Sequence, residues 1–333
     1  MTRQAIPTLD DFTSATDPAA RLEQLVVQAK TYPGDERWRP RRGDCAMSEP
    51  RTPRTVDLQP LDQHRFRLGE GGRWDGTDFW QVDLLDGNLW RSAGGIAELS
   101  RLLDLDEPLG AMAPVAGGGM IVIAGTGVAL VDQAANMDWI GRPAGGHQPP
   151  RRVNDAAVAS GRLFFGTMDF PGTVGSGQLW RVDPDRTVTE LLDGLGCPNG
   201  PACTADGRTL YLADSAVGTI RRYLVSDEGA LEGGDVLVSI PEQLGVPDGM
   251  TVDDDDHLWV ALWGGSAIAR IDPDGNWADL LSMPAKQPTS VTIADGRMLV
   301  TSARGDLAEP GELDGATFVL STDVTAPATA AFG

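Results

Sequence analysis

A short pattern that recurs six times along the chain constrains the fold more than any single residue does. Each copy has a turn rich in Asp or small residues, then an apolar strand, then a second strand that opens with Gly. The apolar strands recur at intervals of about 40 to 48 residues, which is typical of radial arrays of small sheets. Their central residues are Trp80, Val122, Phe165, Tyr211, Trp259 and Leu299. The repeat predicts an all-β fold, a six-bladed β-propeller.

Closure of the ring explains why the units would pack radially. A lone twisted sheet exposes an apolar face and an open edge, whereas blades packed around an axis bury the faces. The last strand pair, which ends at residues 315–320, lacks strands to complete its blade, and we expect the segment Asp57–Arg67 to supply one. Dipeptides such as Asp206-Gly207 and Asp274-Gly275 fit the tight turns between strands. A β-sandwich of irregular strands is the alternative.

We divide the chain into an N-terminal extension (1–56), the propeller (57–325) and a C-terminal tail (326–333). Within the extension, apolar residues of Asp17–Lys30 recur at helical spacing and predict a short helix. We expect the extension to pack on the propeller or to tether a neighbouring subunit in a homo-oligomer. A disordered tail is the alternative.

Composition excludes several classes of partner. The 333 residues carry a formal net charge of −21, so nucleic acid and anionic membrane surfaces would repel the protein. The chain lacks the ~18 consecutive apolar residues of a membrane span, and its start lacks the apolar core of a secretion signal. We therefore expect a cytoplasmic protein that binds neither nucleic acid nor membrane. Cys45, Cys197 and Cys203 show no metal-binding spacing, and we expect reduced thiols.

Polar side chains recur just before four of the apolar strands, where a plain core would be apolar. The segments are Leu68–Trp74, Arg152–Asp155, Pro198–Gly200 and Pro247–Met250. Equivalent positions in a propeller surround one axis, and carboxylates that converge there are costly to bury without a partner. A bound cation offsets that cost. Glu70, Asn199 and Asp248 offer only oxygen atoms, which suits Ca²⁺, Mg²⁺ or Mn²⁺ and leaves Zn²⁺ open. Asn-Gly and Asp-Gly are also common in plain turns, which is the structural alternative.

These motifs occur in the order seen in one known family. They are Gly69-Glu70-Gly71, Arg152-Val153-Asn154-Asp155 with Gly166-Thr167-Met168, Asn199-Gly200, and Pro247-Asp248-Gly249 with Leu258-Trp259-Val260-Ala261. Over about residues 66–320 the chain resembles the regucalcin, gluconolactonase and luciferin-regenerating-enzyme family. The resemblance implies a six-bladed propeller that holds one divalent cation in its channel and hydrolyses sugar or related lactones.

The resemblance also implies roles for single residues. Glu70, Asn199 and Asp248 match the cation ligands, with Ca²⁺ favoured, while Arg152 and Asn154 match substrate contacts at the channel mouth. A carboxylate beside a cation can deprotonate a water molecule, so we expect Asp248 to act as the general base as well. Ligation alone is the alternative for Asp248.

Two further residues are candidate substrate contacts. Asp169 follows Gly166-Thr167-Met168, near the place where some sugar-lactone members carry an acidic residue. His147 lies just before the Arg152 segment and could reach the mouth as an acid or a base. A plain loop histidine is the alternative. Asp214-Ser215 is either a supporting pair for the site or a strand-end cap. The run of four acidic residues at 253–256 falls between two strands, where we expect a solvated turn.

One departure from the family pattern concerns the loop after Glu70. The family commonly has Pro there, whereas this chain has Gly72 and then Arg73, which we expect to loosen the loop or to add charge near the mouth. We expect a metal-dependent lactonase with a small lactone as substrate. One alternative is a biosynthetic propeller enzyme or an organophosphate or ester hydrolase with the same cation site. The other is a non-catalytic Ca²⁺-binding or carbohydrate-binding protein, although cation storage would not need substrate donors such as Arg152 and Asn154.

Overall fold

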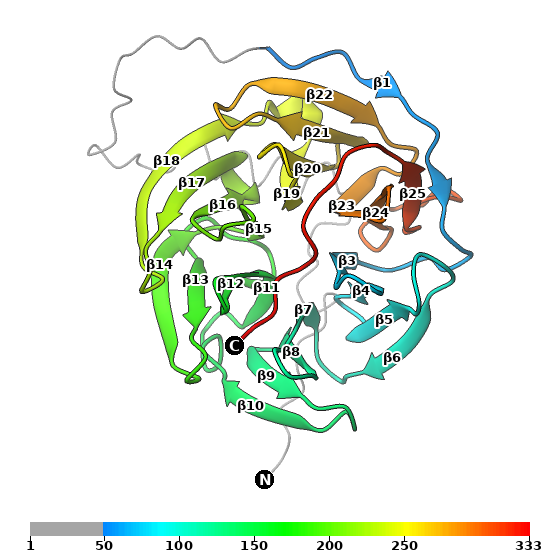
Figure 1. Ribbon diagram of the computed structural model, residues 1–333. Helices are drawn as coiled ribbons and strands as arrows, with labels where there is room; N and C mark the ends of the chain where they lie inside the picture. The colour runs from blue at the N-terminus through cyan, green and yellow to red at the C-terminus, as the bar shows by residue number, and fades with distance from the viewer. Residues whose placement is uncertain (1–48) are drawn as a thin grey trace.

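The computed structural model describes residues 49–333 and shows six sheets arranged around one central axis (Figure 1). Five sheets have four strands and the sixth has five. The predicted all-β, six-bladed propeller is therefore confirmed. The helix predicted within Asp17–Lys30 lies outside the described residues. No helix within residues 49–333 is long and apolar enough to cross a membrane.

Each blade runs from an inner strand at the axis to an outer strand at the rim. The inner strands are β3 (Gly69–Trp74), β7 (Leu109–Pro114), β11 (Arg151–Ala159), β15 (Pro198–Cys203), β19 (Val246–Val252) and β23 (Gln287–Ala294). The second strands contain the apolar residues of the repeat and are β4 (Phe79–Asp83), β8 (Met120–Ala124), β12 (Arg162–Asp169), β16 (Thr209–Asp214), β20 (Leu258–Trp263) and β24 (Arg297–Ala303).

The third and outer strands complete the blades. The third strands are β5 (Asn88–Ser92), β9 (Gly127–Val131), β13 (Gly177–Val182), β17 (Thr219–Val225), β21 (Ala267–Ile271) and β25 (Phe318–Ser321). The outer strands are β6 (Ser100–Asp104), β10 (Met137–Gly141), β14 (Val188–Leu195), β18 (Leu231–Ser239), β22 (Trp277–Ser282) and β2 (Gln59–Pro60). Two 3₁₀ turns, η2 (Ser215–Val217) and η3 (Glu242–Leu244), follow β16 and β18.

The ring closes by pairing an early strand with a late one. Strand β2 is antiparallel to β25, with Gln59 opposite Val319 and Pro60 opposite Phe318. The expectation that the segment Asp57–Arg67 completes the last blade is confirmed. Just before it, β1 (Arg54–Thr55) pairs in parallel with β22 and makes that blade five-stranded.

The hydrophobic core lies mainly between neighbouring blades. In one cluster, Tyr211 and Val238 of the β15–β18 blade pack with Val260 and Leu262 of the next blade. Burial of each such side chain stabilises the fold by about 1.5–3 kcal/mol. Because these contacts join two sheets, the blades support one another and hold the inner strands in a fixed register around the channel.

The acidic run at 253–256 is a turn between two strands, as predicted, but its first residue is buried and not solvated. The Asp253 side chain is buried and accepts a hydrogen bond from Trp259 Nε1 at 2.9 Å. The Asp253 Oδ2 atom also accepts a hydrogen bond from Arg270 Nη2 at 2.6 Å. Asp253 therefore fastens the turn to its own blade, while the next three acidic residues are exposed.

The C-terminal strap, residues 325–333, crosses one end of the central channel (Figure 1). The backbone N–H of Thr329 donates to Trp74 O at 2.7 Å, and that of Phe332 donates to Pro114 O at 2.9 Å. The Phe332 side chain is buried in the core between the second and third blades. The segment that we assigned to a tail thus ties several blades together at this end.

Candidate functional site

A β-bulge interrupts every inner strand at an equivalent level of the channel. The register shifts lie between Glu70 and Arg73, Leu109 and Ala111, Val153 and Ala156, Asn199 and Ala202, Pro247 and Met250, and Pro288 and Ser290. A bulge bends its strand and turns a side chain away from the regular alternation. The polar segments found in the sequence are therefore these bulges, and they lie at one level of the channel.

Glycines make these bulges sterically feasible. Gly71 and Gly200 have φ of 59° and 47°, a backbone conformation that costs glycine little. A Cβ at Gly200 would also lie 2.6 Å from the backbone oxygen of Asp248 on the adjacent inner strand. Gly200 thus allows two blades to approach closely and allows the backbone to bend at the bulge. The Asn199-Gly200 dipeptide does not form a plain turn.

Two buried carboxylates, Glu70 and Asp248, have strongly perturbed acidities. Burial raises the pKa of Glu70 well above its usual range, and the charges of Asp248 and Asp155 raise it further. Burial also raises the pKa of Asp248, and the charge of Asp155 adds to that effect. All three side chains are buried. The cluster therefore holds more negative charge than its surroundings stabilise.

The residues present fit a divalent cation. Asp248 Oδ1 is buried and has no hydrogen-bond partner among residues 49–333, which is costly for a carboxylate oxygen unless something else contacts it. Within that same range, no three His, Cys, Asp or Glu side chains are arranged to hold a metal ion by themselves. An amide oxygen is therefore needed beside Glu70 and Asp248, and Asn199 carries one. The assignment of these three residues as ligands stays a prediction.

A chain of side-chain hydrogen bonds fixes the two amides of the site. Arg152 Nη1 donates to Asn154 Oδ1 at 2.6 Å, and Asn154 Nδ2 donates to Asn199 Oδ1 at 2.6 Å. Asn199 Nδ2 donates to Ser215 Oγ at 2.9 Å, and Ser215 Oγ donates to Pro247 O at 2.5 Å. A carbonyl oxygen has two lone pairs, so Asn199 Oδ1 can accept from Asn154 and also face a cation. The chain links three blades and ends beside Asp248.

The sequence left two roles open for Asp214-Ser215, support of the site or a cap at the strand end. In the structure each residue takes one of these roles. Ser215 supports the site through Asn199. Asp214 caps the neighbouring turn instead, because its carboxylate accepts the backbone N–H groups of Gly196 and Cys197 at 3.0 Å each.

The two remaining predicted substrate contacts, Asp169 and His147, form no hydrogen bond with this chain that we find within residues 49–333. The Asp169 side chain is buried, and its Oδ1 accepts the backbone N–H of Thr173 at 2.8 Å, which caps its own turn. His147 is half-buried in the loop between β10 and β11. A substrate contact for Asp169 or His147 stays a prediction.

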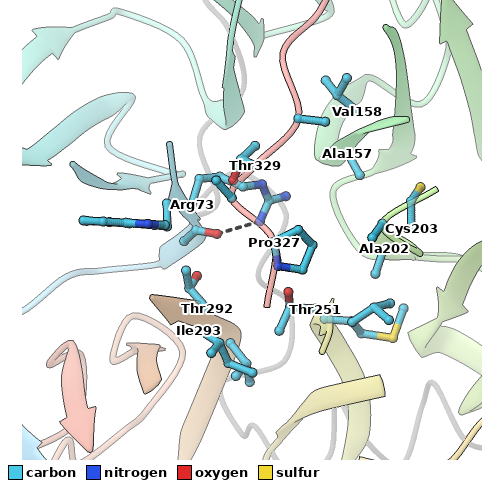
Figure 2. A pocket seen from close by; sticks show the side chains of 18 of the residues that line it. Arg73, Ala157, Val158, Ala202, Cys203, Thr251, Thr292, Ile293, Pro327 and Thr329 are labelled. Carbon is cyan, nitrogen blue, oxygen red and sulfur yellow. Dashed lines mark hydrogen bonds between the residues drawn. The ribbon is translucent and has the colours of Figure 1, made fainter. Parts of the chain in front are cut away.

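Gly72 and Arg73 lie in strand β3 and not in a loop, which corrects the expectation of a loosened loop. Charge near the mouth stays a prediction. The Arg73 guanidinium donates to Gly72 O at 2.7 Å, to Asp155 Oδ1 at 3.0 Å and to Ala156 O. Figure 2 shows Arg73 beside the strap, at a cavity of about 120 Å³. The side chain thus reaches from the first blade to the third.

Sequence reasoning missed the contribution of the sixth blade. Ser290 Oγ accepts the backbone N–H of Gly72 at 3.0 Å, and Thr289 Oγ1 donates to Gly69 O. Thr301 Oγ1 contacts both hydroxyls, at 2.7 Å and 2.6 Å. These hydroxyls hold the strand that carries Glu70, and no motif in the sequence marked them.

One thiol borders this arrangement, because Asn199 Nδ2 also donates to Cys197 Sγ at 3.7 Å. Cys197 and Cys203 are free, as predicted, and Cys45 lies outside the described residues. Burial raises the pKa of both described thiols to about 12, so they stay protonated at neutral pH.

Comparisons with known proteins agree with the geometry. The family described as the SMP-30/Gluconolactonase/LRE-like region matches residues 68–304. Pentonolactonase XacC of Haloferax volcanii is 38% identical over 162 residues, which cover 47% of this chain and 55% of that protein. L-arabinolactonase of Azospirillum brasilense is 31% identical over 299 residues, which cover 82% and 94%. The structure of regucalcin from Agrobacterium tumefaciens, a calcium-binding protein, matches with a TM-score of 0.76 at 26% identity and covers 84% of this chain and 98% of that one.

Proposed function

Because this chain belongs to the SMP-30/Gluconolactonase/LRE-like family, we propose that it is a divalent-cation-dependent hydrolase that opens a sugar lactone. The observation that carries the proposal is the buried pair of carboxylates Glu70 and Asp248, with raised pKa values and an unpartnered Asp248 oxygen. Two similar proteins are named for the hydrolysis of pentonolactones and L-arabinolactone. We therefore favour a five-carbon aldonolactone as the substrate.

Glu70, Asn199 and Asp248 would hold the cation, with Ca²⁺ favoured because all their donor atoms are oxygens. Lewis-acid polarisation of the lactone carbonyl is the chemistry that a cation at this place would supply.

Asp248 is the proposed general base. Its Oδ1 atom has no hydrogen-bond donor among the described residues, so it can accept a proton from water. A carboxylate with a raised pKa is also a better base near neutral pH than an ordinary one. The deprotonated water attacks the carbonyl carbon, the ring C–O bond breaks, and the ring oxygen takes up a proton to leave a hydroxy acid.

Arg152 and Asn154 are the proposed substrate-binding residues. Both side chains are buried, and the Arg152–Asn154 hydrogen bond fixes the amide in one orientation. A guanidinium and an oriented amide can recognise the hydroxyl groups of a sugar lactone by directional hydrogen bonds.

Calcium binding without catalysis is the second candidate function. The Agrobacterium tumefaciens regucalcin, described as a calcium-binding protein, shares the fold and 26% of the sequence. The same carboxylates would then hold Ca²⁺, and no lactone would be turned over.

The test separates these candidates. Chelator-stripped protein would be assayed with a pH indicator on pentono- and hexonolactones, with Ca²⁺, Mg²⁺, Mn²⁺ or Zn²⁺ restored singly. We expect turnover to return with a cation and to fall by about 10²–10⁴-fold in Asp248→Asn, the range for removal of a general base. The exposed residue Asp254 supplies a matched control, Asp254→Asn, which should behave as the unaltered protein does. Cation binding without turnover of any lactone would favour the calcium-binding function instead.

A further inference from the structure

We propose that Arg73 and Asp155 form a charge pair across the channel that sets the net charge, and thereby the cation affinity, of the site. The inference rests on the proposed cation site. It assigns a positioning role to Arg73, which contacts neither of the two predicted carboxylate ligands in any hydrogen bond or ion pair found among residues 49–333.

The pair is buried and held in one geometry. The Arg73 and Asp155 side chains are 11% and 4% exposed, and Arg73 Nη2 lies 3.0 Å from Asp155 Oδ1. The same guanidinium is anchored on both sides of the channel, to Gly72 O on the first blade and to Ala156 O on the third. Asp155 Oδ1 also accepts the backbone N–H of Ala156 at 2.7 Å. Neither charge can turn away into bulk water without breaking these bonds.

The charge of Asp155 reaches the proposed ligands. The Asp155 carboxylate accepts a hydrogen bond from the backbone N–H of Gly200, the residue after the proposed ligand Asn199. Asn154, the residue before Asp155, donates its Nδ2 to Asn199 Oδ1 at 2.6 Å. The three carboxylates therefore surround one place in the channel, and the charge of Asp155 acts on both Glu70 and Asp248. Arg73 neutralises the member of the cluster that is not a proposed ligand. A guanidinium is protonated at every physiological pH, so Arg73 always supplies its positive charge to the pair. Glu70 and Asp248 then remain as the two carboxylates that match the charge of a divalent cation.

Arg73 has little contact with bulk water, because its side chain is 11% exposed. Figure 2 shows Arg73 beside the strap residues Pro327 and Thr329, which line the same cavity. The strap covers this end, and its Thr329 backbone is bonded to Trp74 O beside Arg73. Charges with little water around them interact over longer distances than exposed charges do. The cavity leaves room for a different side chain at position 73, so Arg73 can be replaced without a steric clash.

The cation affinity should therefore differ between a variant that lacks the charge of Asp155 alone and a variant that lacks the charges of both Asp155 and Arg73. Asp155→Asn keeps the shape of the side chain but leaves the charge of Arg73 buried, unpaired and close to the cation. Combining it with Arg73→Met removes that charge and restores the original net charge of the pair. A pair that only supports the fold would not distinguish the two variants in cation affinity.

The experiment measures Ca²⁺ and Tb³⁺ affinities of chelator-stripped protein by calorimetry and by Tb³⁺ luminescence. We expect Asp155→Asn to weaken Ca²⁺ binding by about tenfold or more, and Arg73→Met/Asp155→Asn to bind Ca²⁺ at least about fivefold more tightly than Asp155→Asn does. The ratio of Tb³⁺ to Ca²⁺ affinity should fall in the single variant and recover in the double variant, because a trivalent ion feels the unpaired charge more strongly.

Equal Ca²⁺ affinities of the single and double variants, with binding intact in the unaltered protein, would overturn this inference and leave the proposed function standing. An unaltered protein that binds none of the tested cations would remove the cation from the proposed function and this inference with it. Should Asp155→Asn fail to fold, Arg73→Lys/Asp155→Asn and Arg73→Met/Asp155→Asn give the same comparison, since they differ only in the charge at position 73. Equal affinities there would likewise refute the charge pair.

Discussion

Ser215 offers the sharpest test of how the amide of Asn199 is oriented. Its hydroxyl is the only link between the side chain of Asn199 and the backbone of Pro247 that we find within residues 49–333. Ser215→Ala removes one oxygen atom and leaves both partners in place. The Asn199 amide then keeps its bonds to Asn154 and Cys197 but loses the strongest bond of its Nδ2 atom, so its oxygen is held less firmly in the direction that a cation ligand needs.

The magnitude follows from the two groups that lose their partner. Asn199 Nδ2 and Pro247 O are bonded to Ser215 Oγ at 2.9 Å and 2.5 Å, and the Asn199 side chain is buried. Each buried polar group left unsatisfied costs about 1–3 kcal/mol. Because Asn199 Nδ2 keeps a weak contact with Cys197 Sγ, we count Pro247 O alone in full and expect the free energy of unfolding to fall by about 1–3 kcal/mol. Loss of a group that orients a metal ligand typically lowers metal affinity by about 10–100-fold.

Calorimetric titration of Ca²⁺ and urea unfolding in chelator measure the two effects separately. The exposed serine at the end of β18 in the same blade supplies the control Ser239→Ala, which should alter neither quantity. A Ca²⁺ affinity of Ser215→Ala within about twofold of the unaltered protein would refute the reasoning, because an orienting group would then have no effect on the ion.

Two further predictions concern pH and the strap. In the folded chain without cation, Glu70 and Asp248 have raised pKa values, so between the ordinary carboxyl pKa of about 4 and the raised folded values the folded state holds more protons than the unfolded state. The free energy of unfolding in chelator should therefore fall as pH rises through that window, whereas the stabilisation by Ca²⁺ should increase over the same range. Thermal unfolding measured across pH, in chelator and in Ca²⁺, tests both expectations. A stability that rose with pH under both conditions would contradict them. Phe332 is 3% exposed between two blades, so Phe332→Ala should lower the free energy of unfolding by about 3–5 kcal/mol, and an unchanged urea midpoint would show that the strap is not part of the cooperative fold.

The blades could be predicted from the sequence because their second strands carry an unusually clear signal. Residues such as Phe165 and Val260 are fully buried between sheets, so apolar side chains recur there once in every blade. The closing strand β2 could also be placed, because the last blade lacked a strand and only one segment was available. These features depend on local periodicity and on counting, both of which a single sequence contains.

The bulges could not be predicted from the same information. Asn199-Gly200 is a sound turn dipeptide, and nothing local distinguishes a turn from a bulge in an inner strand. The neighbouring blade determines the local conformation, because the backbone oxygen of Asp248 lies too close to position 200 for any Cβ there. The plain turn that the sequence left open as an alternative for this dipeptide is therefore excluded, because both residues lie in a bulged inner strand.

The contacts of Arg73 could not be predicted for a related reason. The nearness of Arg73 to Glu70 in the sequence suggested a shared position at the mouth, but a β-bulge separates the two residues in the strand. The strand carries Arg73 past the carboxylates toward the strap, where its partner Asp155 is 82 residues away in the sequence. A contact that crosses the channel has no period along the chain and leaves no local signal.

The site is also where this fold departs furthest from the rules that stabilise it elsewhere. Two buried carboxylates with raised pKa values, one of them with an unpartnered oxygen, sit on strands that are interrupted by bulges. Such departures persist only where the surrounding structure is strong enough to impose them. Here the pairing of β2 with β25 closes the ring, and the strap joins inner strands at the far end. A cation that relieves the repulsion between Glu70 and Asp248 should therefore raise the stability of the whole ring, because the blades that carry these residues cannot move apart separately.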